Sequence, residues 1–461
     1  MARKFQNSSQ PLPYGRGSDL SRDRKGAVLG TMSLQLLVIL VPVLFGFMGF
    51  AIDLGRLYLI RGELNEAANA MALAAAAQLN GSTAADTNTV SVLPPPIGSG
   101  PTYNYNFGSV PVGVGAGNLS SSINPPACFA TVADATSAGG NSTDCADPTA
   151  QFVQVSLTAD APLLFWSLLP GGESRKTTIA AQAVAGISAP LCTACNIVPI
   201  GIVAINAGDT LNFGFDATFS SIYTFSYSCI GTPPTILSGT VPYFILNRLD
   251  SNSSLTENDQ LYADDAGGLV ASTTPTPNAN TTNASTPLAC ANVADNEEPW
   301  TNAVPLACSG TAAPPRTTIE SALCGLYSRL DNTQTPSACT TAVDDFAALS
   351  PGYLPDTDVV AGEVPPYSAY TGDGRRLITV AIMDRAPITA TDNPIILGFR
   401  QFLLVPNTDG TFFQPTDPYG RFPALYIGNP APVQQGWFDS RYAGACVQGT
   451  FTGPGKVVLH Q

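Results

Sequence analysis

Cysteines at close spacing are the first residues of this chain whose types and spacing could support chemistry. Cys192 and Cys195 form the only CxxC sequence. A redox dithiol normally begins a helix, where the helix dipole lowers the pKa of a thiol. This pair instead precedes an apolar, strand-like run at residues 197–205, so we favour a structural disulfide. A zinc site would need a second pair of ligands, and the sequence offers neither another CxxC nor a nearby histidine.

The other reactive side chains form no catalytic pattern. His460 is the only histidine and stands one residue from the end of the sequence, which argues against the cleft that Ser-His-Asp catalysis needs. Adjacent carboxylates could serve glycoside hydrolysis, but neighbouring acids in polar loops usually belong to a solvated surface. The adjacent pairs are Asp264-Asp265, Glu297-Glu298 and Asp344-Asp345.

Sequence motifs for bound cofactors are also missing. The chain has no phosphate-binding glycine loop with Lys-Ser/Thr, no H-E-x-x-H and no G-x-S-x-G. The NTDG sequence of residues 407–410 falls short of the EF-hand spacing and predicts a turn, which leaves incidental calcium binding open. We therefore expect no catalysis, no cofactor and no small-molecule substrate.

A long apolar segment must position everything that follows it. Residues 26–52 carry no ionisable side chain. As a helix this segment would be about 40 Å long, more than the roughly 30 Å of a bilayer core. Because only a backbone with internally closed hydrogen bonds crosses lipid, the segment predicts a transmembrane helix. Pro42 removes one backbone donor, so a kink is expected near residues 38–42.

The helix is expected to continue beyond the membrane as an amphipathic stalk over residues 53–80. Apolar side chains recur there in steps of three and four, which places them on one helical face. They are Leu54, Leu57, Ile60, Leu64, Ala67, Ala68, Met71, Ala75 and Leu79. Alanine, the best helix former, fills most of residues 67–78, and Asn80-Gly81 supplies a C-terminal stop. The alternative is a membrane anchor followed by a separate surface helix.

The residues before the span predict its orientation. Residues 1–25 contain six basic side chains, which places this tail in the cytoplasm under the positive-inside rule. The apolar run is too long for a cleavable secretory signal. All ten cysteines lie after the span, in agreement with an oxidising compartment on that side. We expect a single-pass protein of the bacterial inner membrane, with a periplasmic or cell-surface ectodomain.

The N-terminal features together resemble TadG-like proteins, which belong with the TadE and TadF pseudopilins of the bacterial Flp (tight-adherence) pilus machinery. The residues that carry the resemblance are the basic tail, Gly26-Ala27, the uncharged span, Asp53-Leu54-Gly55-Arg56, Leu64-Asn65-Glu66-Ala67-Ala68 and the alanine run. A prepilin carries Glu at the fifth position after its cleavage glycine. Here Thr31 follows Gly26 and Gln35 follows Gly30 at that spacing, so processing by a prepilin peptidase stays open.

The resemblance implies that the helix packs against pseudopilin helices or pilus-secretion proteins. Small residues allow close helix contact in lipid, and Pro42 would set a matching bend. Asp53 and Arg56 could pair with each other or mark the membrane boundary, while Glu63 or Glu66 could meet a basic residue of a partner helix. The expected contact residues are Gly26, Gly30, Pro42, Gly46, Asp53, Arg56, Glu63 and Glu66, with Ser33 and Gly49 as further small residues.

Cysteine spacing suggests local disulfides. The candidate pairs are Cys128–Cys145, Cys192–Cys195, Cys290–Cys308 and Cys324–Cys339, which leaves Cys229 and Cys446 for each other. Sequence alone does not fix connectivity, so other pairings stay open.

The remainder of the chain predicts a mainly antiparallel, β-rich α+β ectodomain. We expect a linker at residues 81–126, a small β-rich subdomain at 127–189, and a larger one at 190–461 with a low-complexity loop at 250–299. Strands are expected from alternating or apolar patterns, a short apolar helix at 163–169 and another helix at 317–331. The strand ranges are 152–157, 177–187, 197–205, 210–215, 222–227, 241–246, 375–383, 395–405, 422–427 and 457–459.

Function follows from the resemblance more than from the ectodomain. It implies a non-enzymatic, membrane-anchored structural component of Flp/Tad pilus assembly that acts by protein contact. A membrane-anchored adhesin or binding protein is the first alternative, and an exported hydrolase is the second. The net charge of −14 argues against nucleic acid as a partner.

Overall fold

The structure is a computed structural model, and it describes part of the chain. The described residues are 24–91, 93, 102–103, 110–111, 121–123, 126–163, 165, 176–195, 197–229, 234, 236–246, 255–267, 290–293, 317–330, 336–358, 366–389, 391–407, 411–433, 436–437 and 453–460.

The chain divides into two compact units. The first comprises residues 1–60 and 160–179, and the second comprises residues 61–159 and 180–461. Three elements contribute to both units because the division falls within them. They are helix α1 (Arg24–Ala76), strand β5 (Phe152–Pro162) and strand β6 (Lys176–Ile187).

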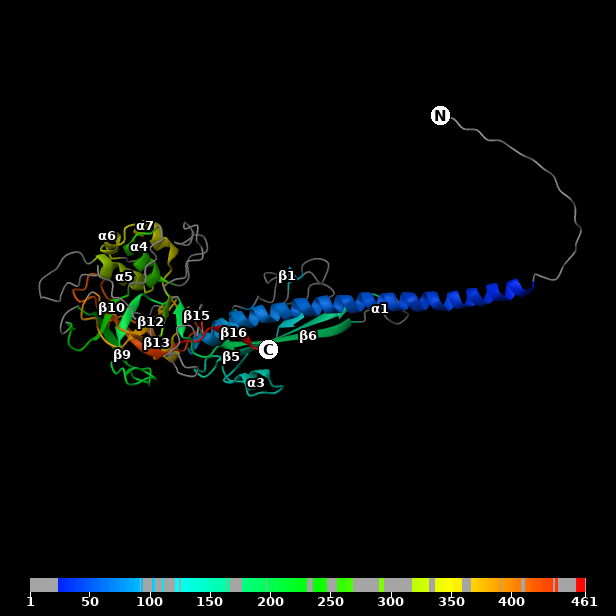
Figure 1. Cartoon of the computed structure of the whole chain (residues 1–461), viewed down its shortest axis with the longest axis horizontal. Coiled ribbons are helices and arrows are strands. Elements are labelled where there is room, and N and C mark those ends of the chain that lie inside the picture. Colours follow the sequence, from blue (N-terminus) through cyan, green and yellow to red (C-terminus); the bar gives the residue numbers. More distant parts are fainter. Residues whose placement is uncertain are drawn as a thin grey trace, which may run out of the picture. The chain divides into compact units, whose positions relative to one another are not determined.

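Helix α1 is one continuous element, drawn in blue in Figure 1. It includes both the predicted span and most of the predicted stalk, with Pro42 in its interior. The expectation of a single helix is confirmed, and the alternative of a separate surface helix is wrong. The stripe expected on the stalk is buried from Ile60 onward, because Leu64, Ala68 and Ala75 have no exposed surface.

The predicted helix stop at Asn80-Gly81 comes four residues too late, since α1 ends at Ala76. The chain then tightens to three-residue turns, in which the Gln78 amide donates to the Ala75 carbonyl at 3.0 Å. The Asn80 side-chain oxygen accepts from the Ser82 amide at 3.1 Å, and Gly81 adopts φ +74°, a conformation that glycine reaches without strain. This turn leads into a short helix, α2 (Ala84–Ser91), within the range expected to be a linker.

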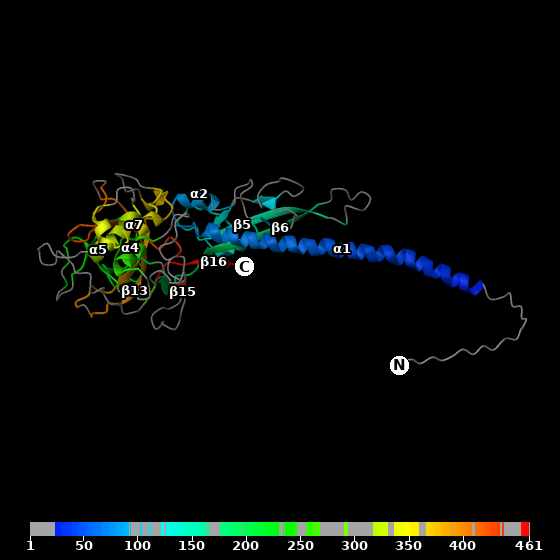
Figure 2. The ribbon, with the colours of Figure 1, turned by 90° about the horizontal axis from the view of Figure 1, so that it is seen from above.

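A sheet of the second unit has the strand order β16-β6-β5-β3, with β4 also paired to β5. The additional strands are β3 (Ser121–Ile123), β4 (Ala127–Phe129) and β16 (Val457–His460). Alternate residues Val153, Val155 and Leu157 are fully buried, as the period of two predicted. Both Figure 1 and Figure 2 show β5, β6 and β16 running beside the C-terminal half of α1. A short helix, α3 (Val132–Thr136), follows β4.

A closed six-stranded barrel forms the main core of the second unit. Its order is β10-β8-β12-β13-β14-β9, and the pairs β8–β12 and β9–β10 are parallel while the other four are antiparallel. The strands are β8 (Ile200–Val203), β9 (Ile222–Tyr227), β10 (Val241–Ile245), β12 (Leu377–Met383), β13 (Ile396–Leu404) and β14 (Phe422–Gly428). Aromatic rings fill the interior, for example Phe225 against Phe402 with centroids 5.2 Å apart. The mainly antiparallel, β-rich class is confirmed, although the sequence did not predict closure.

One predicted strand is wrong. Residues 210–215 form turns because the Asp209 carboxylate accepts from the backbone amides of Leu211, Asn212 and Gly214 at 3.0, 3.2 and 3.0 Å. These bonds satisfy the amides locally, where a strand would need a partner.

Helices cluster beside the barrel. They are α4 (Glu257–Ala266), α5 (Thr317–Ser328), α6 (Cys339–Ala342) and α7 (Phe346–Leu349), followed by the 3-10 turns η4 (Ser350–Gly352) and η5 (Tyr367–Ala369). Helix α5 confirms the helical spacing predicted at 317–331. Helix α4 was missed, because it lies within the range 250–299 that was expected to be a loop. Thr256 caps α4 by accepting from the Asp259 amide at 3.3 Å.

Two smaller β elements complete the described chain. Strands β11 (Cys290–Asn292), β7 (Thr193–Cys195) and β15 (Gly436–Trp437) form a three-stranded sheet in that order. Strands β1 (Thr102–Tyr103) and β2 (Val110–Pro111) form a two-stranded ribbon.

Candidate functional site

Residues 34–52 of helix α1 present mostly apolar side chains to their surroundings. Leu37, Ile39 and Phe47 are 58, 69 and 68% exposed, and their neighbours are exposed around the helix in the same way. By length and composition alone, the described helix from Leu34 to Ala76 could cross a membrane, because an 18-residue window of it has a mean hydropathy of 2.4. So large an apolar surface is unstable in water and requires a lipid or protein covering.

Near the end of this apolar segment, one side of α1 is covered by the chain itself at Gly49 and Asp53. The backbone amide of Phe165 donates to both carboxylate oxygens of Asp53, at 3.2 and 3.1 Å, and Asp53 is only 4% exposed. The Phe165 ring lies against Gly49, where a Cβ atom would overlap it. Gly49 and Asp53 stand four residues apart and therefore face the same side of α1. Asp53 and Gly49 therefore contact the same residue, Phe165.

The other predicted contact residues are distributed along α1 and do not converge. Gly26 and Gly30 lie in its first turns, Pro42 is exposed and Gly46 is half-buried. Arg56 and Glu63 are half-buried, and Glu66 is exposed. The sequence analysis did not predict the hydrogen bond from the Phe165 amide to the Asp53 carboxylate. Two features of the sequence could have indicated it: Gly49 stands one helical turn before Asp53, and an apolar stretch lies between two predicted strands.

The end of the stalk contacts the barrel part of the second unit. The Tyr367 hydroxyl donates to the Asn80 carbonyl, and the Thr83 amide donates to the Ser368 carbonyl at 3.0 Å. Tyr367 is 7% exposed, and this burial raises the pKa of its hydroxyl, so the hydroxyl stays a donor at neutral pH. The turn after α1 is therefore held by η5.

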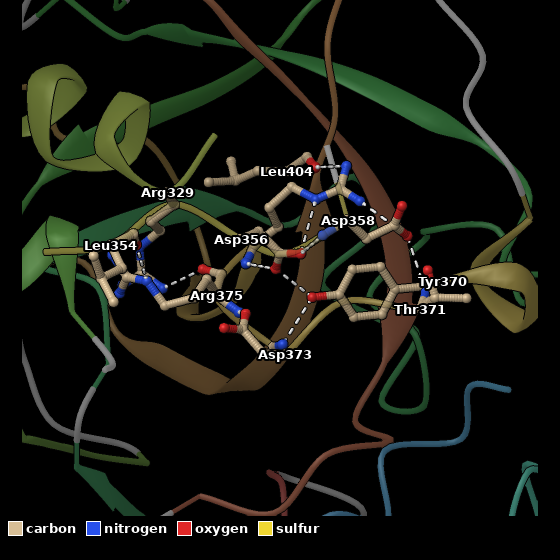
Figure 3. Close-up of polar contacts among 11 residues, drawn as sticks. Arg329, Leu354, Asp356, Asp358, Tyr370, Thr371, Asp373, Arg375 and Leu404 are labelled. Carbon is tan, nitrogen blue, oxygen red and sulfur yellow. Dashed lines mark hydrogen bonds and ion pairs between the residues drawn. The ribbon is translucent and has the colours of Figure 1, made fainter. Parts of the chain in front are cut away.

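Asp356 is the centre of a buried polar network between the helices and the barrel (Figure 3). Its carboxylate accepts from the Tyr370 hydroxyl, from the Arg376 amide at 2.9 Å and from the Asp358 amide at 2.8 Å. The Arg376 guanidinium lies 3.9 Å from Asp356 and 3.6 Å from Asp358. The Asp356 side chain is fully buried, so these donors replace the water it loses.

Two further arginines extend the network toward the helices. Arg375 donates to the carbonyls of Leu354 and Ala266, the latter at 2.7 Å. Arg329 donates to the carbonyls of Arg375 and Leu377 at 3.0 and 3.2 Å. Burial and the neighbouring Arg375 guanidinium lower the pKa of Arg329 to about 9. These bonds connect the ends of α4 and α5 to strand β12, so the arginines stabilise the packing of the helices on the barrel.

The predicted surface acids do not all lie on the surface. Asp265 sits in α4 with no exposed area, so its assignment to a solvated loop is wrong, while Asp344 and Asp345 are exposed. Burial and the adjacent Asp264 raise the pKa of the Asp265 carboxyl well above its ordinary value. Helix α5 covers Asp265, because Gly325 lies against its Cβ atom. Glu297 and Glu298 lie outside the described residues.

Other side chains considered for catalysis or binding have structural surroundings. The His460 ring packs edge-on against Phe152, with centroids 5.0 Å apart. A cavity of about 550 Å³ is lined by residues that include Gln78, Asn80, Asp373 and Gln401. Gln401 donates to the Ala431 carbonyl at 2.8 Å and is thus already bonded. Within the described ranges, no three His, Cys, Asp or Glu side chains are grouped to hold a metal ion.

Two predicted disulfides are confirmed. Cys128–Cys145 and Cys324–Cys339 are bonded, with Cα atoms 5.1 and 5.7 Å apart. Cys192 and Cys229 are also disulfide-bonded, and the last three residues of the CxxC sequence form strand β7 (Thr193–Cys195), so the sequence does not begin a helix. The side chain of Cys195 and those of Cys290, Cys308 and Cys446 lie outside the described part, so the remaining pairings stay predictions.

Fold and helix surface together define a class: a long apolar N-terminal helix that carries a β-rich, disulfide-containing domain. Residues 30–78 match the family model of putative Flp pilus-assembly TadE/G-like proteins. The TadE/G-like character of the N-terminal segment is thereby confirmed, and the match falls entirely within α1 and the turn that follows it. No curated protein and no solved structure matches the chain.

Proposed function

We propose that this protein is a membrane-anchored structural component of Flp (Tad) pilus assembly that acts by protein contact in the bacterial envelope. The observation that carries the proposal is the coincidence of the TadE/G-like match, at residues 30–78, with an apolar helix surface that is left uncovered. A pilus-assembly role needs binding surfaces and no catalysis, which agrees with the structural surroundings of the buried acids.

Several features support an anchor with its N-terminus in the cytoplasm. Six basic side chains precede the charge-free segment, and the exposed apolar residues Leu34 to Ile52 match the thickness of a bilayer core. The disulfides Cys128–Cys145 and Cys324–Cys339 lie after the helix and persist only in an oxidising compartment. The domain after α1 would then lie in the periplasm or at the cell surface.

The protein would contact its partners both inside the membrane and outside it. In the membrane, the small residues Gly30 and Gly46 of α1 are two separate points where a pseudopilin helix could approach closely, because small side chains bring helix backbones together. Outside it, the exposed Glu66 is available to a basic residue of a partner. The ectodomain would meet pilus or secretion-channel proteins.

A span exchange tests the role of the helix. Residues 27–52 are replaced by an unrelated transmembrane segment of equal length, and the basic tail and ectodomain are kept. We expect normal insertion and export but reduced piliation and surface attachment, because partner helices no longer fit. A scrambled span that retains Gly30, Pro42 and Gly46 serves as the matched control. Full piliation of cells that carry the unrelated span would show that the helix only anchors the protein, and would refute a role of the helix in partner contact.

A reporter fusion tests the orientation. Alkaline phosphatase joined after Asn80 should be active, and a reporter that works only in the cytoplasm should be inactive at the same point. Asn80 follows the end of α1, so the fusion leaves the anchor intact. The opposite pattern would overturn both the topology and the periplasmic assignment of the disulfides.

A further inference from the structure

A second charge-free segment of the chain meets α1 at the level where the charge-free run of the helix ends. Residues 161–172 contain no ionisable side chain and lie between Asp160 and Glu173, as residues 26–52 lie before Asp53. Leu163 and Phe165 are the described residues of this segment beyond the end of β5, and both are half-buried. Phe165 is the residue that contacts Gly49 and Asp53.

The two contacts of Phe165 give it a direction along the helix. Its amide bonds to Asp53, while its ring covers Gly49, four residues closer to the helix N-terminus. Four residues of α-helix correspond to about 6 Å. The ring therefore extends about one helical turn from the Asp53 level back along the apolar run. In an anchored protein, that is the direction into the bilayer.

We propose that Leu163 and Phe165 insert into the outer leaflet of the bilayer beside α1 and form a second membrane contact of the ectodomain. The inference rests on the anchor of the proposed function. About 20 helical residues cross a bilayer core, so a span that ends at Ile52 begins near Ser33, and Gly49 lies about 4.5 Å inside the boundary. The Phe165 ring then sits at the depth where aromatic side chains gather in membrane proteins.

The contact between Phe165 and Asp53 also explains how an acidic residue can lie at the membrane boundary. A carboxylate near the hydrocarbon is costly unless donors satisfy it. The Phe165 amide donates to both oxygens of Asp53, and this also satisfies a backbone donor that would otherwise face lipid. A contact in water would need neither the buried carboxylate nor an uncharged segment. With two attachment points, α1 is fixed in rotation about its axis, so a defined face of the span is left for partners.

Depth-dependent fluorescence quenching tests the proposal on the full-length protein in phosphatidylcholine vesicles. The background variant carries Trp166→Phe, Trp300→Phe and Trp437→Phe, which removes every tryptophan. Three single reporters are then compared: Phe165→Trp, Leu44→Trp in the helix, and Phe219→Trp, which is 41% exposed in the second unit. Two lipids serve as quenchers in separate samples: one brominated near the headgroup end of the acyl chain, at the depth expected for Phe165→Trp, and one brominated near the terminal methyl, at the depth expected for Leu44→Trp.

We expect loss of emission for the Phe165→Trp and Leu44→Trp reporters, and unchanged emission for Phe219→Trp. Quenching of Leu44→Trp without quenching of Phe165→Trp would overturn the second membrane contact while the anchor stands. If neither reporter is quenched, the anchor of the proposed function is itself refuted. Adding Gly49→Leu should shift the Phe165→Trp emission, because the new side chain overlaps the ring. Gly46→Leu should not, since no atom lies within 4 Å of a Cβ atom there. Equal effects of both substitutions would refute the contact.

Discussion

Replacing Asp356 by alanine should destabilise the barrel part of the protein far more than removing an exposed ion pair. The Asp356 carboxylate is fully buried and accepts from the Tyr370 hydroxyl and from the amides of Arg376 and Asp358. Alanine leaves these donors without an acceptor and removes one of the two carboxylates beside the Arg376 guanidinium.

The magnitude follows from these contacts. Breaking a buried charge pair by removing one partner costs about 3–5 kcal/mol. The unsatisfied donors belong to the same network, so their separate costs of about 1–3 kcal/mol each cannot simply be added. Arg376 keeps Asp358 at 3.6 Å, which limits the loss to that range. For a domain of this size, the expected fall in melting temperature is about 6–20 °C.

The assay is thermal unfolding of the full-length protein in mild detergent, followed by near-ultraviolet circular dichroism. Arg385→Ala is the control, because the Arg385 side chain is 42% exposed and pairs with Asp392. Exposed pairs contribute at most about 1 kcal/mol, so this variant should melt within about 4 °C of the parent. Asp356→Asn, which keeps the volume, separates the loss of charge from the cavity. Equal melting temperatures for Asp356→Ala and Arg385→Ala would refute the reasoning.

Three further predictions use the same melting assay. Burial raises the pKa of Asp265, so the folded state retains a proton that the unfolded chain releases above about pH 4, and the melting temperature should fall as pH rises from there. Asp265→Asn should flatten this dependence, and an unchanged slope would contradict the assignment. Tyr367→Phe loses the hydrogen bond to the Asn80 carbonyl. A loss of about 1 kcal/mol of stability should lower the melting temperature by about 2–4 °C. An unchanged melting temperature would show that this hydrogen bond is not made. Replacing Cys324 and Cys339 by alanine removes a disulfide with a sequence separation of 15 and should cost about 3 kcal/mol, whereas unaltered melting would mean that the bond is absent in solution.

Local patterns predicted the elements whose determinants are local. A charge-free run followed by alanine-rich, three-and-four spacing specifies α1, because each residue contributes to one helix without distant partners. Alternation at 152–157 gave the buried face of β5. Cys128–Cys145 and Cys324–Cys339 were found by spacing, since short loops close at low entropic cost.

Features that depend on distant partners escaped prediction. Asp265 looked like a solvated acid because nothing nearby in the sequence shows that α5 covers it through Gly325. Barrel closure depends on two parallel pairs, β8–β12 and β9–β10, whose registers no local pattern encodes. The contact of Phe165 with Asp53 joins residues 112 positions apart, so the apolar stretch alone could not identify its partner.

Strand β16 has a consequence for how the protein matures. It pairs with β6 in the register Val457 to Ile187 and His460 to Val184, and the Lys456 amide donates to the Ser188 hydroxyl across a sequence separation of 268. In the proposed topology the N-terminus stays in the cytoplasm and the ectodomain crosses from the α1 side onward, so β6 would emerge long before β16. The edge of β6 would then stay unpaired until nearly all of the ectodomain had been translocated, and an open edge invites pairing with other chains. In that topology the sheet could be completed only after residues 457–460 had crossed, and the β6 edge would be open to other strands until then.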